Sequence, residues 1–278
     1  MNKPSRSLLL AAAALLAVCS ASAQTIIGAW SFGDPSVANS GSGVVVFLSN
    51  GYFFHAENAE TGAAPTGFDG MERGTYSWNS GTGAMTINTL TDSNGDIGPS
   101  SIFSGALFSV SGDVLTITDA DGPSTGSATM SRVTGASPLV GAWSFGDPSV
   151  ANSGSGVVVF LPNGYFFHAE NAETGAAPTG FDGMERGTYV WTPGTGAMTI
   201  STLTDSNGDI GPSSIFSGAL FSVSGDVLTI TDADGPSTGS ANMSRVSAIP
   251  EPSTYAALAG LGALGLAVWR RRKLQVAA

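Results

Sequence analysis

The feature that most constrains this chain is an internal duplication. Residues 26–133 align without a gap to residues 139–246 at an offset of 113, and about 100 of the 108 positions are identical. A self-similar unit of this length is a whole domain, because the repeats of solenoid proteins are only about 20–50 residues long. The sequence therefore predicts two copies of one small domain, joined by a short linker from Thr134 to Pro138.

Short apolar or alternating segments, bounded by turn residues, predict the strands of each copy. In the first copy they are residues 26–32, 44–48, 52–56, 74–78, 84–90, 106–110, 114–118 and 126–133. Asn50-Gly51 predicts a hairpin with a type I′ turn. About eight strands in such a short unit predict an all-β fold of two tandem small antiparallel β-barrels or sandwiches, with helices only at the two ends of the chain.

The charge distribution limits the classes of partner. The chain has a formal net charge of −11, and its middle keeps only four basic residues, Arg73, Arg132, Arg186 and Arg245. Such an acidic body would repel a phosphate backbone, which excludes nucleic-acid binding. The only cysteine is Cys19, which lies in the N-terminal leader described next. We therefore expect no disulfide, no thiolate catalysis and no cysteine-bound metal in the mature protein.

Residues 1–23 have the three parts of a secretory signal peptide. Two basic residues precede an apolar run from Leu8 to Val18, and Ala21 and Ala23 flank Ser22 as a small-residue cleavage site. The run is about half of the roughly 20 residues that a membrane anchor needs. A lipoprotein signal ending at Cys19 is an alternative, although Val18 stands where such signals usually carry a small residue. We expect export by the Sec translocon and cleavage by signal peptidase.

The other end, residues 249–278, also has three parts in order. These are the motif Pro250-Glu251-Pro252, an apolar stretch predicted as a transmembrane helix over 254–269, and the basic residues Arg270, Arg271 and Arg272, followed by Lys273. The segment resembles the PEP-CTERM sorting signal. The resemblance implies processing by an exosortase and removal of the tail. It also implies delivery to the cell surface or the exopolysaccharide matrix of a Gram-negative bacterium.

The physical properties of the tail agree with this resemblance. A helix of about 15 residues reaches about 22 Å, which is short of a hydrocarbon core of about 30 Å. The basic cluster would hold the C-terminus in the cytoplasm and leave the body outside. We therefore expect a membrane contact that lasts only until processing. A tail anchor that is never cut is the alternative.

Each copy opens with Gly-Ala-Trp and closes with an arginine. The pairs are Trp30 with Arg132 and Trp143 with Arg245. This pattern resembles calycin or lipocalin-like barrels, in which an arginine near the end of the last strand packs over the tryptophan of the first. The resemblance implies a structural pair at one end of the barrel, which a cation–π contact would stabilise by about 0.5–2 kcal/mol.

An acidic turn in each copy places oxygen ligands as calcium loops do. The residues are Asp92, Asn94 and Asp96 in the first copy and Asp205, Asn207 and Asp209 in the second. The pattern departs from the EF-hand, because Ile97 replaces the turn glycine and Phe103 stands where the bidentate glutamate belongs. A polar turn is the favoured interpretation. We expect no cofactor, with Ca²⁺ as the alternative.

His55 and Glu57 would share one face of a strand, as half of a metal site or as an acid–base pair. A solvated strand end is the favoured interpretation, and Glu72 and Arg73 are expected to pair with neighbours. No context marks a serine as a nucleophile. The leading hypothesis is therefore a non-enzymatic protein of the cell surface or biofilm matrix. The rivals are a calycin-like binder of small ligands and, last, a hydrolase that uses His55 and Glu57.

Overall fold

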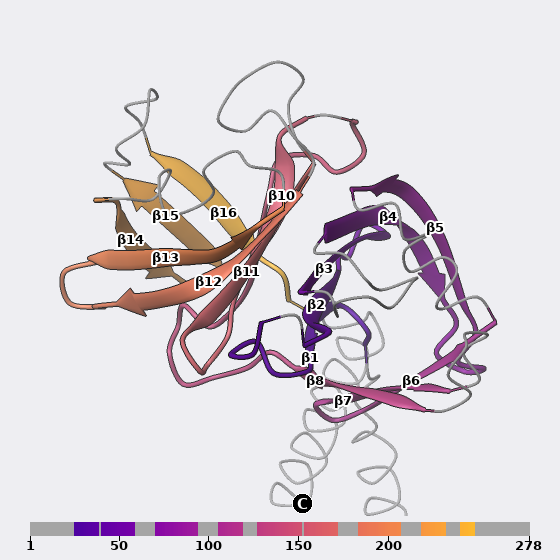
Figure 1. Ribbon diagram of the computed structural model, residues 1–278. Coiled ribbons are helices and arrows are strands. Elements are labelled where there is room, and N and C mark those ends of the chain that lie inside the picture. The colour runs from indigo at the N-terminus through magenta and orange to yellow at the C-terminus, as the bar shows by residue number, and fades with distance from the viewer. Residues whose placement is uncertain are drawn as a thin grey trace, which may run out of the picture. The chain divides into compact units, whose positions relative to one another are not determined.

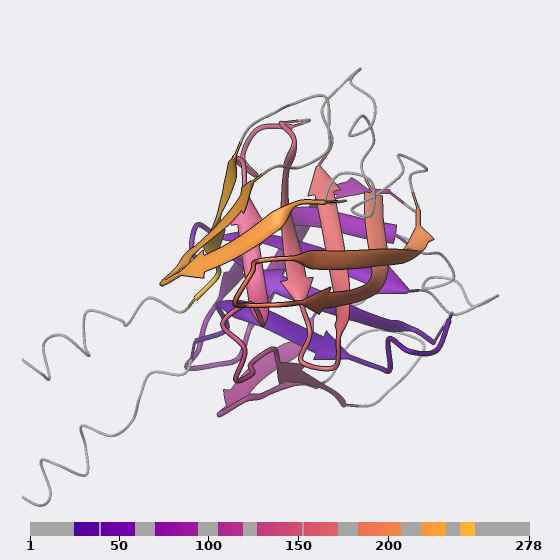
Figure 2. The ribbon, with the colours of Figure 1, turned by 90° about the vertical axis from the view of Figure 1, so that its left-hand side faces the viewer.

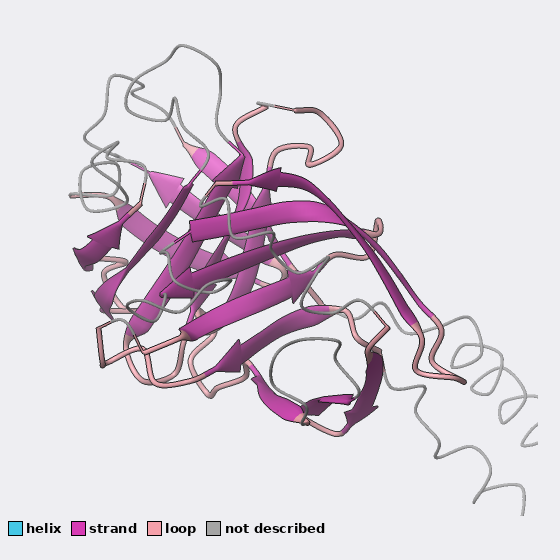
Figure 3. Ribbon diagram, turned by 45° about the vertical axis from the view of Figure 1, so that its right-hand side comes forward, coloured by secondary structure: helices cyan, strands magenta, loops and turns pink. Residues whose placement is uncertain are grey.

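The computed structural model describes residues 25–38, 40–58, 70–93, 105–118, 127–151, 153–171, 183–206, 218–231 and 240–247. Within these residues the regular structure is all strand (Figure 3), and none of it forms a helix that could cross a membrane. Residues Ile26–Ala248 form one compact unit. The predicted signal peptide, sorting tail and transmembrane helix lie outside the described residues.

Each repeat contributes eight strands to the described part of the chain (Figure 1). In the first repeat they are β1 (Gly28–Phe32), β2 (Ser42–Phe47), β3 (Tyr52–Asn58), β4 (Gly70–Trp78), β5 (Met85–Asp92), β6 (Leu107–Ser111), β7 (Val114–Thr118) and β8 (Ala128–Arg132). In the second they are β9 (Gly141–Phe145), β10 (Ser155–Phe160), β11 (Tyr165–Asn171), β12 (Gly183–Trp191), β13 (Met198–Asp205), β14 (Leu220–Ser224), β15 (Val227–Thr231) and β16 (Ala241–Arg245). The prediction of an all-β fold with about eight strands per repeat is confirmed.

The strands of each repeat form one curled antiparallel sheet and not a two-sheet sandwich (Figure 2). The order in the first sheet is β5-β4-β3-β2-β1-β8-β7-β6, and the second sheet repeats it. The curl brings the two edge strands together at a single bridge, Ala84 with Leu107. Next to it the N–H of Phe108 donates to the carbonyl of Gly83 at 2.8 Å. Each sheet therefore closes at one end in the manner of a small barrel.

The inner face of the first sheet is filled by side chains. Because successive residues of a strand point to opposite faces, every second residue enters this interior. The buried cluster consists of Ile26, Trp30, Val45, Phe47, Phe53, Met85, Ala106, Phe108, Leu115, Ile117 and Met130. The equivalent residues of the second repeat fill the second sheet. The interior is thus a packed core along most of its length.

The outer face of β1–β4 is also buried, because it packs against the outer face of β9–β12. One hydrophobic cluster joins the two faces: Ala29, Val44, Val46, Leu48, Phe54, Ala56, Met71 and Val133 with Val140, Ala142, Val157, Val159, Leu161, Phe167, Ala169 and Met184. The sequence explains this double burial, since every residue of β2 is buried and Val44 to Phe47 is apolar throughout. A strand covered on only one face would alternate instead.

The turn between β2 and β3 differs from the prediction. Leu48 N–H donates to the carbonyl of Tyr52 at 2.8 Å, and Gly51 N–H donates to that of Leu48 at 3.2 Å. The loop therefore has three residues, and Gly51 has a φ of 83°. This is a type I turn followed by a left-handed glycine, so the type I′ prediction is wrong. Pro162 in the second repeat occupies the turn position where its fixed φ is favourable.

A partly buried tyrosine packs against the interior cluster of each repeat, Tyr76 on β4 and Tyr189 on β12. The hydroxyl of Tyr76 donates to the carbonyl of Leu48 at 2.7 Å, and the ring meets Phe47 edge-on at a centroid distance of 4.8 Å. Tyr189 makes the same contacts with Leu161 and Phe160. Burial raises the pKa of both hydroxyls to about 12. The repeats contain no lysine, so tyrosines dominate their alkaline titration.

We predict that the protein loses stability between about pH 10 and pH 12. The pKa of an unfolded tyrosine is about 10, so the folded state favours the neutral hydroxyl. That stabilisation is complete below pH 10 and is lost as the pH rises through the folded pKa. Urea unfolding measured from pH 8 to pH 12 should show the decline. Replacing both residues (Tyr76→Phe and Tyr189→Phe) should flatten it, and an unchanged slope would contradict the assignment.

Candidate functional site

The described residues with the most unusual environment are a histidine and two glutamates inside each barrel. In the register of the first sheet, His55 on β3 pairs with Val45 on β2 and with Glu72 on β4. Val45 and Phe53 belong to the interior cluster, so His55 and Glu57 face inward on the same side of β3. The sheet therefore brings an imidazole and two carboxylates together inside an otherwise apolar barrel.

The geometry of this cluster is tight. Nδ1 of His55 shares a short hydrogen bond with Oε2 of Glu72, and its Nε2 lies 3.7 Å from Oε2 of Glu57. The ring stacks on Phe32 with a centroid distance of 5.7 Å and an interplanar angle of 14°. His55 is 4 % exposed, Glu57 5 % and Glu72 1 %. The prediction of a solvated strand end for His55 and Glu57 is therefore wrong, because both side chains are buried in the barrel.

The second repeat has the same arrangement. His168 shares a hydrogen bond with Glu185, lies 3.7 Å from Glu170 and stacks on Phe145 at 5.7 Å. We refer to the two sets, His55/Glu57/Glu72 and His168/Glu170/Glu185, as the His–Glu clusters. Because the repeats are nearly identical in sequence, the second copy adds no independent support for a function.

A carboxylate–imidazole pair can hold a proton and orient the histidine ring, as pairs in acid–base sites do. The other carboxylate oxygen of Glu72, Oε1, is buried and has no hydrogen-bond partner among the described residues. The described residues contain no group of three or more His, Cys, Asp and Glu side chains arranged to hold a metal ion. The arrangement thus favours proton sharing or a hydrogen bond to a small molecule.

Sequence reasoning placed His55 and Glu57 on one face but missed their partners. Glu72 joins them only because β4 pairs with β3 in a particular register, across the segment 59–69 that separates the two strands. Phe32 comes from β1, further away in the sequence. Neither partner has a local sequence signal, because cross-strand register is decided by tertiary pairing.

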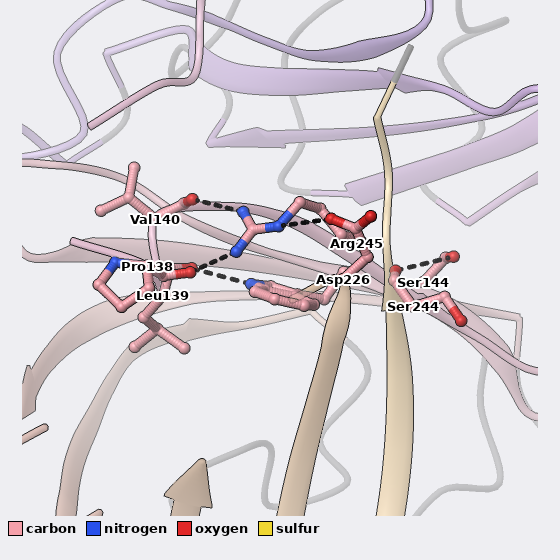
Figure 4. A network of polar contacts seen from close by, with 8 residues as sticks. Pro138, Leu139, Val140, Ser144, Asp226, Ser244 and Arg245 are labelled. Atoms are coloured by element: carbon pink, nitrogen blue, oxygen red, sulfur yellow. Dashed lines mark hydrogen bonds and ion pairs between the residues drawn. The ribbon is translucent and has the colours of Figure 1, made fainter. Parts of the chain in front are cut away.

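The tryptophan and the arginine at the barrel end lie together in both repeats. The Arg132 guanidinium carbon lies 4.0 Å from the centroid of the Trp30 ring, and the corresponding distance from Arg245 to Trp143 is 4.1 Å. In Figure 4 Arg245 donates to the carbonyls of Pro138 and Val140. The ion pairs with Asp113 and Asp226, each at 3.5 Å, involve exposed carboxylates and contribute little.

The glycine of each Gly-Ala-Trp motif leaves room for this arginine. Gly28 has a φ of 129°, and a Cβ built on it would lie 2.8 Å from a guanidinium nitrogen of Arg132. The indole N–H of Trp30 donates to the carbonyl of Ile26 at 2.8 Å, which fixes the ring below the arginine. The motif is therefore explained as structure: it packs a cation over an aromatic ring and satisfies nearby carbonyls.

The remaining predicted site residues fall mainly outside the described residues. Asp92 ends β5 and Asp205 ends β13, whereas their proposed companions Asn94, Asp96, Asn207 and Asp209 are not described. The signal-cleavage residues Ala21 and Ala23 also lie outside. The same holds for the sorting residues Pro250, Glu251, Pro252, Arg270, Arg271 and Arg272.

Comparison with known proteins identifies one segment of the chain. Residues 248–273 match the PEP-CTERM protein-sorting motif. No curated protein and no solved structure matches the chain. The resemblance of the tail to this sorting signal is therefore confirmed, and the motif implies an exported precursor with an exosortase as its processing partner. The likeness of the repeats to calycins remains a resemblance.

We predict that removing the histidine from one cluster strongly destabilises the protein. In a His55→Ala variant two carboxylates would remain buried without the imidazole, and breaking such a buried pair costs about 3–5 kcal/mol. Chemical denaturation at pH 7 measures the loss. A loss below about 1 kcal/mol would show that the pair contributes little, as exposed pairs do.

The matched control replaces both partners with apolar side chains of similar size (His55→Phe with Glu72→Met). Because the Glu72 carboxylate is then removed together with the imidazole, and only that of Glu57 stays buried, this double variant should recover part of the lost stability. A double-mutant cycle with the two single variants gives the coupling between the side chains.

Proposed function

We propose that the mature protein is a non-enzymatic structural component of the cell surface or extracellular exopolysaccharide matrix. The observation that carries this proposal is the sorting motif at residues 248–273, attached to a body of two packed barrels. Most of each barrel interior is filled by apolar side chains, which suits a module that bears load or spaces other molecules. No cofactor is part of the proposal.

The acidic body fits the proposed setting. The chain carries a formal charge of −11, and the four arginines of the repeats are all at least partly buried in the structure. Their charges therefore offset little of the surface's negative charge. An acidic surface keeps crowded proteins soluble and apart from anionic polymers except where divalent cations bridge them. A calcium-dependent link to acidic polysaccharide is the alternative, with ligands drawn from the acidic segments 92–96 and 205–209.

We predict that delivery depends on the Pro-Glu-Pro motif. Protein recovered from the surface and matrix of the native organism should begin at Gln24 and end near residues 250–252 by intact mass. A Glu251→Ala variant should remain uncut in the membrane fraction, whereas Ser253→Ala, beside the motif, should be delivered normally. A Glu251→Ala protein released to the matrix without its tail would contradict the assignment.

One observation supports a second function, the binding of a small ligand in the barrel. Oε1 of Glu72 is buried without a hydrogen-bond partner among the described residues, and Oε2 of the same carboxylate bonds to His55, whose ring stacks on Phe32. Oε1 can therefore accept a hydrogen bond from a bound molecule. A ring stack with a polar acceptor beside it is a common way to hold a small polar or cationic molecule.

We predict for this second function that some small amine or hydroxyl compound raises the melting temperature of the protein. A ligand present at 100 times its Kd stabilises the folded state by about 2.7 kcal/mol. Thermal-shift measurements on a panel of such compounds test the idea. The rise should disappear in the double variant Glu72→Gln and Glu185→Gln. A flat panel, or a rise that survives in this variant, would favour the structural function alone.

A further inference from the structure

The contact between the two repeats is reciprocal. A guanidinium N–H of Arg73 donates to the carbonyl of Pro148, and one of Arg186 donates to the carbonyl of Pro35. The offset between the repeats is 113, so Arg186 is the counterpart of Arg73 and Pro148 that of Pro35. The same contact therefore occurs twice, once from the first repeat to the second and once from the second to the first. This is the geometry of a twofold homodimer, here contained in one chain.

Each arginine is held in place on its own barrel. Arg73 is 3 % exposed and also donates to Oγ1 of Thr91 at 3.3 Å, and Arg186 does the same with Thr204. The acceptor carbonyl is equally fixed. Asp34 accepts hydrogen bonds from the backbone and hydroxyl of Ser36, which order the turn that presents the carbonyl of Pro35. Both sides of the contact are therefore preformed.

The apolar part of the interface is nearly identical in the two repeats. We call the outer faces of β1–β4 and β9–β12 the pairing faces; their residues form the shared cluster described above. Eight of the 108 aligned positions differ between the repeats: Ile26/Leu139, Ile27/Val140, Ser49/Pro162, Ser77/Val190, Asn79/Thr192, Ser80/Pro193, Asn88/Ser201 and Thr129/Asn242. Among the cluster residues only Val140 stands at such a position, and its counterpart is isoleucine. A pairing face should therefore bind either repeat with about the same affinity.

We propose that the pairing face is a self-recognition surface, through which a repeat binds a repeat of a second chain as well as its own neighbour. Specificity is a difference between affinities, and two faces that differ only by isoleucine against valine at one position have almost none. What favours pairing within a chain is the linker, which holds the two faces at an effective concentration on the order of millimolar. In dilute solution the chain closes on itself.

On a crowded surface the balance changes. When neighbouring chains approach the effective concentration set by the linker, one repeat exchanges its internal partner for a repeat of another chain. If two chains pair both of their repeats with each other, a closed dimer forms. If each repeat of a chain pairs with a different neighbouring chain, an open string of chains forms. The protein then self-associates without needing any other partner. This inference rests on the interface alone and holds whether or not the structural role proposed above is correct.

The first test disables one face at a time in the full exported chain. Val46→Asp places a charge on the face of the first repeat, and Val159→Asp does so at the equivalent position of the second. Either variant blocks internal pairing but leaves one intact face. Each should therefore sediment at twice the mass of the wild-type protein at micromolar concentration. The double variant should sediment as a monomer. A single variant that stays monomeric while folded would overturn the proposal.

The second test keeps every interface residue unchanged, so it decides the matter even if the aspartate variants fail to fold. A site for a specific protease is inserted between Gly135 and Ala136, which are exposed. After cleavage, light and isotopically heavy preparations are mixed and followed by native mass spectrometry. First–first, first–second and second–second pairs should form in a ratio of about 1:2:1, as equal affinities require. Only first–second pairs, or separated repeats, would overturn the proposal.

Discussion

The structure depends on a sheet that is apolar on both faces. Strands β1–β4 carry large side chains into the barrel and a second set of valines, alanines and phenylalanine outward, so one barrel cannot bury them all. The outer set would form a large exposed apolar patch, which soluble proteins avoid. The second repeat covers that patch with the same patch of its own. The second repeat is thus what allows both faces of β1–β4 to be buried.

This constraint also explains the uneven burial of the barrel. Strands β2 and β3 are buried almost throughout, whereas β5–β8 keep the alternation of strands with one face in water. Leu107 and Val114 remain partly exposed there. The half of each barrel that faces the other repeat is therefore a core on both sides, and the half that faces away is an ordinary solvated sheet.

The His–Glu clusters lie in the doubly buried half. A charge pair in such a place is expensive to desolvate and adds little net stability compared with apolar side chains. The interior is otherwise apolar, so packing alone does not explain why each barrel contains a His–Glu cluster. The Trp–Arg pairs differ, because their guanidinium groups are partly exposed and cap carbonyls at the barrel end, which packing and hydrogen bonding explain fully.

Features that are encoded in short stretches of sequence could be predicted without a structure. Residues such as Pro250-Glu251-Pro252 and the basic cluster after the apolar stretch identify the sorting tail, because a peptide signal must be readable without a fold. Alternation and turn residues gave eight strands per repeat, since side-chain direction along a strand has a period of two. The contact of Trp30 with Arg132 followed from a resemblance that rests on two short motifs.

Contacts that depend on strand register, or on which surface packs against which, became visible only in the folded protein. Glu72 meets His55 because β4 aligns with β3 in one register, and a shift of one residue would have turned Glu72 outward. The three-residue turn at Gly51 was decided by the register of β2 with β3 and not by its Asn-Gly dipeptide. The bond from Arg73 to Pro148 joins residues 75 positions apart. Sequence patterns record the direction of each side chain along its own strand, but which strand or repeat it meets is set by long-range packing.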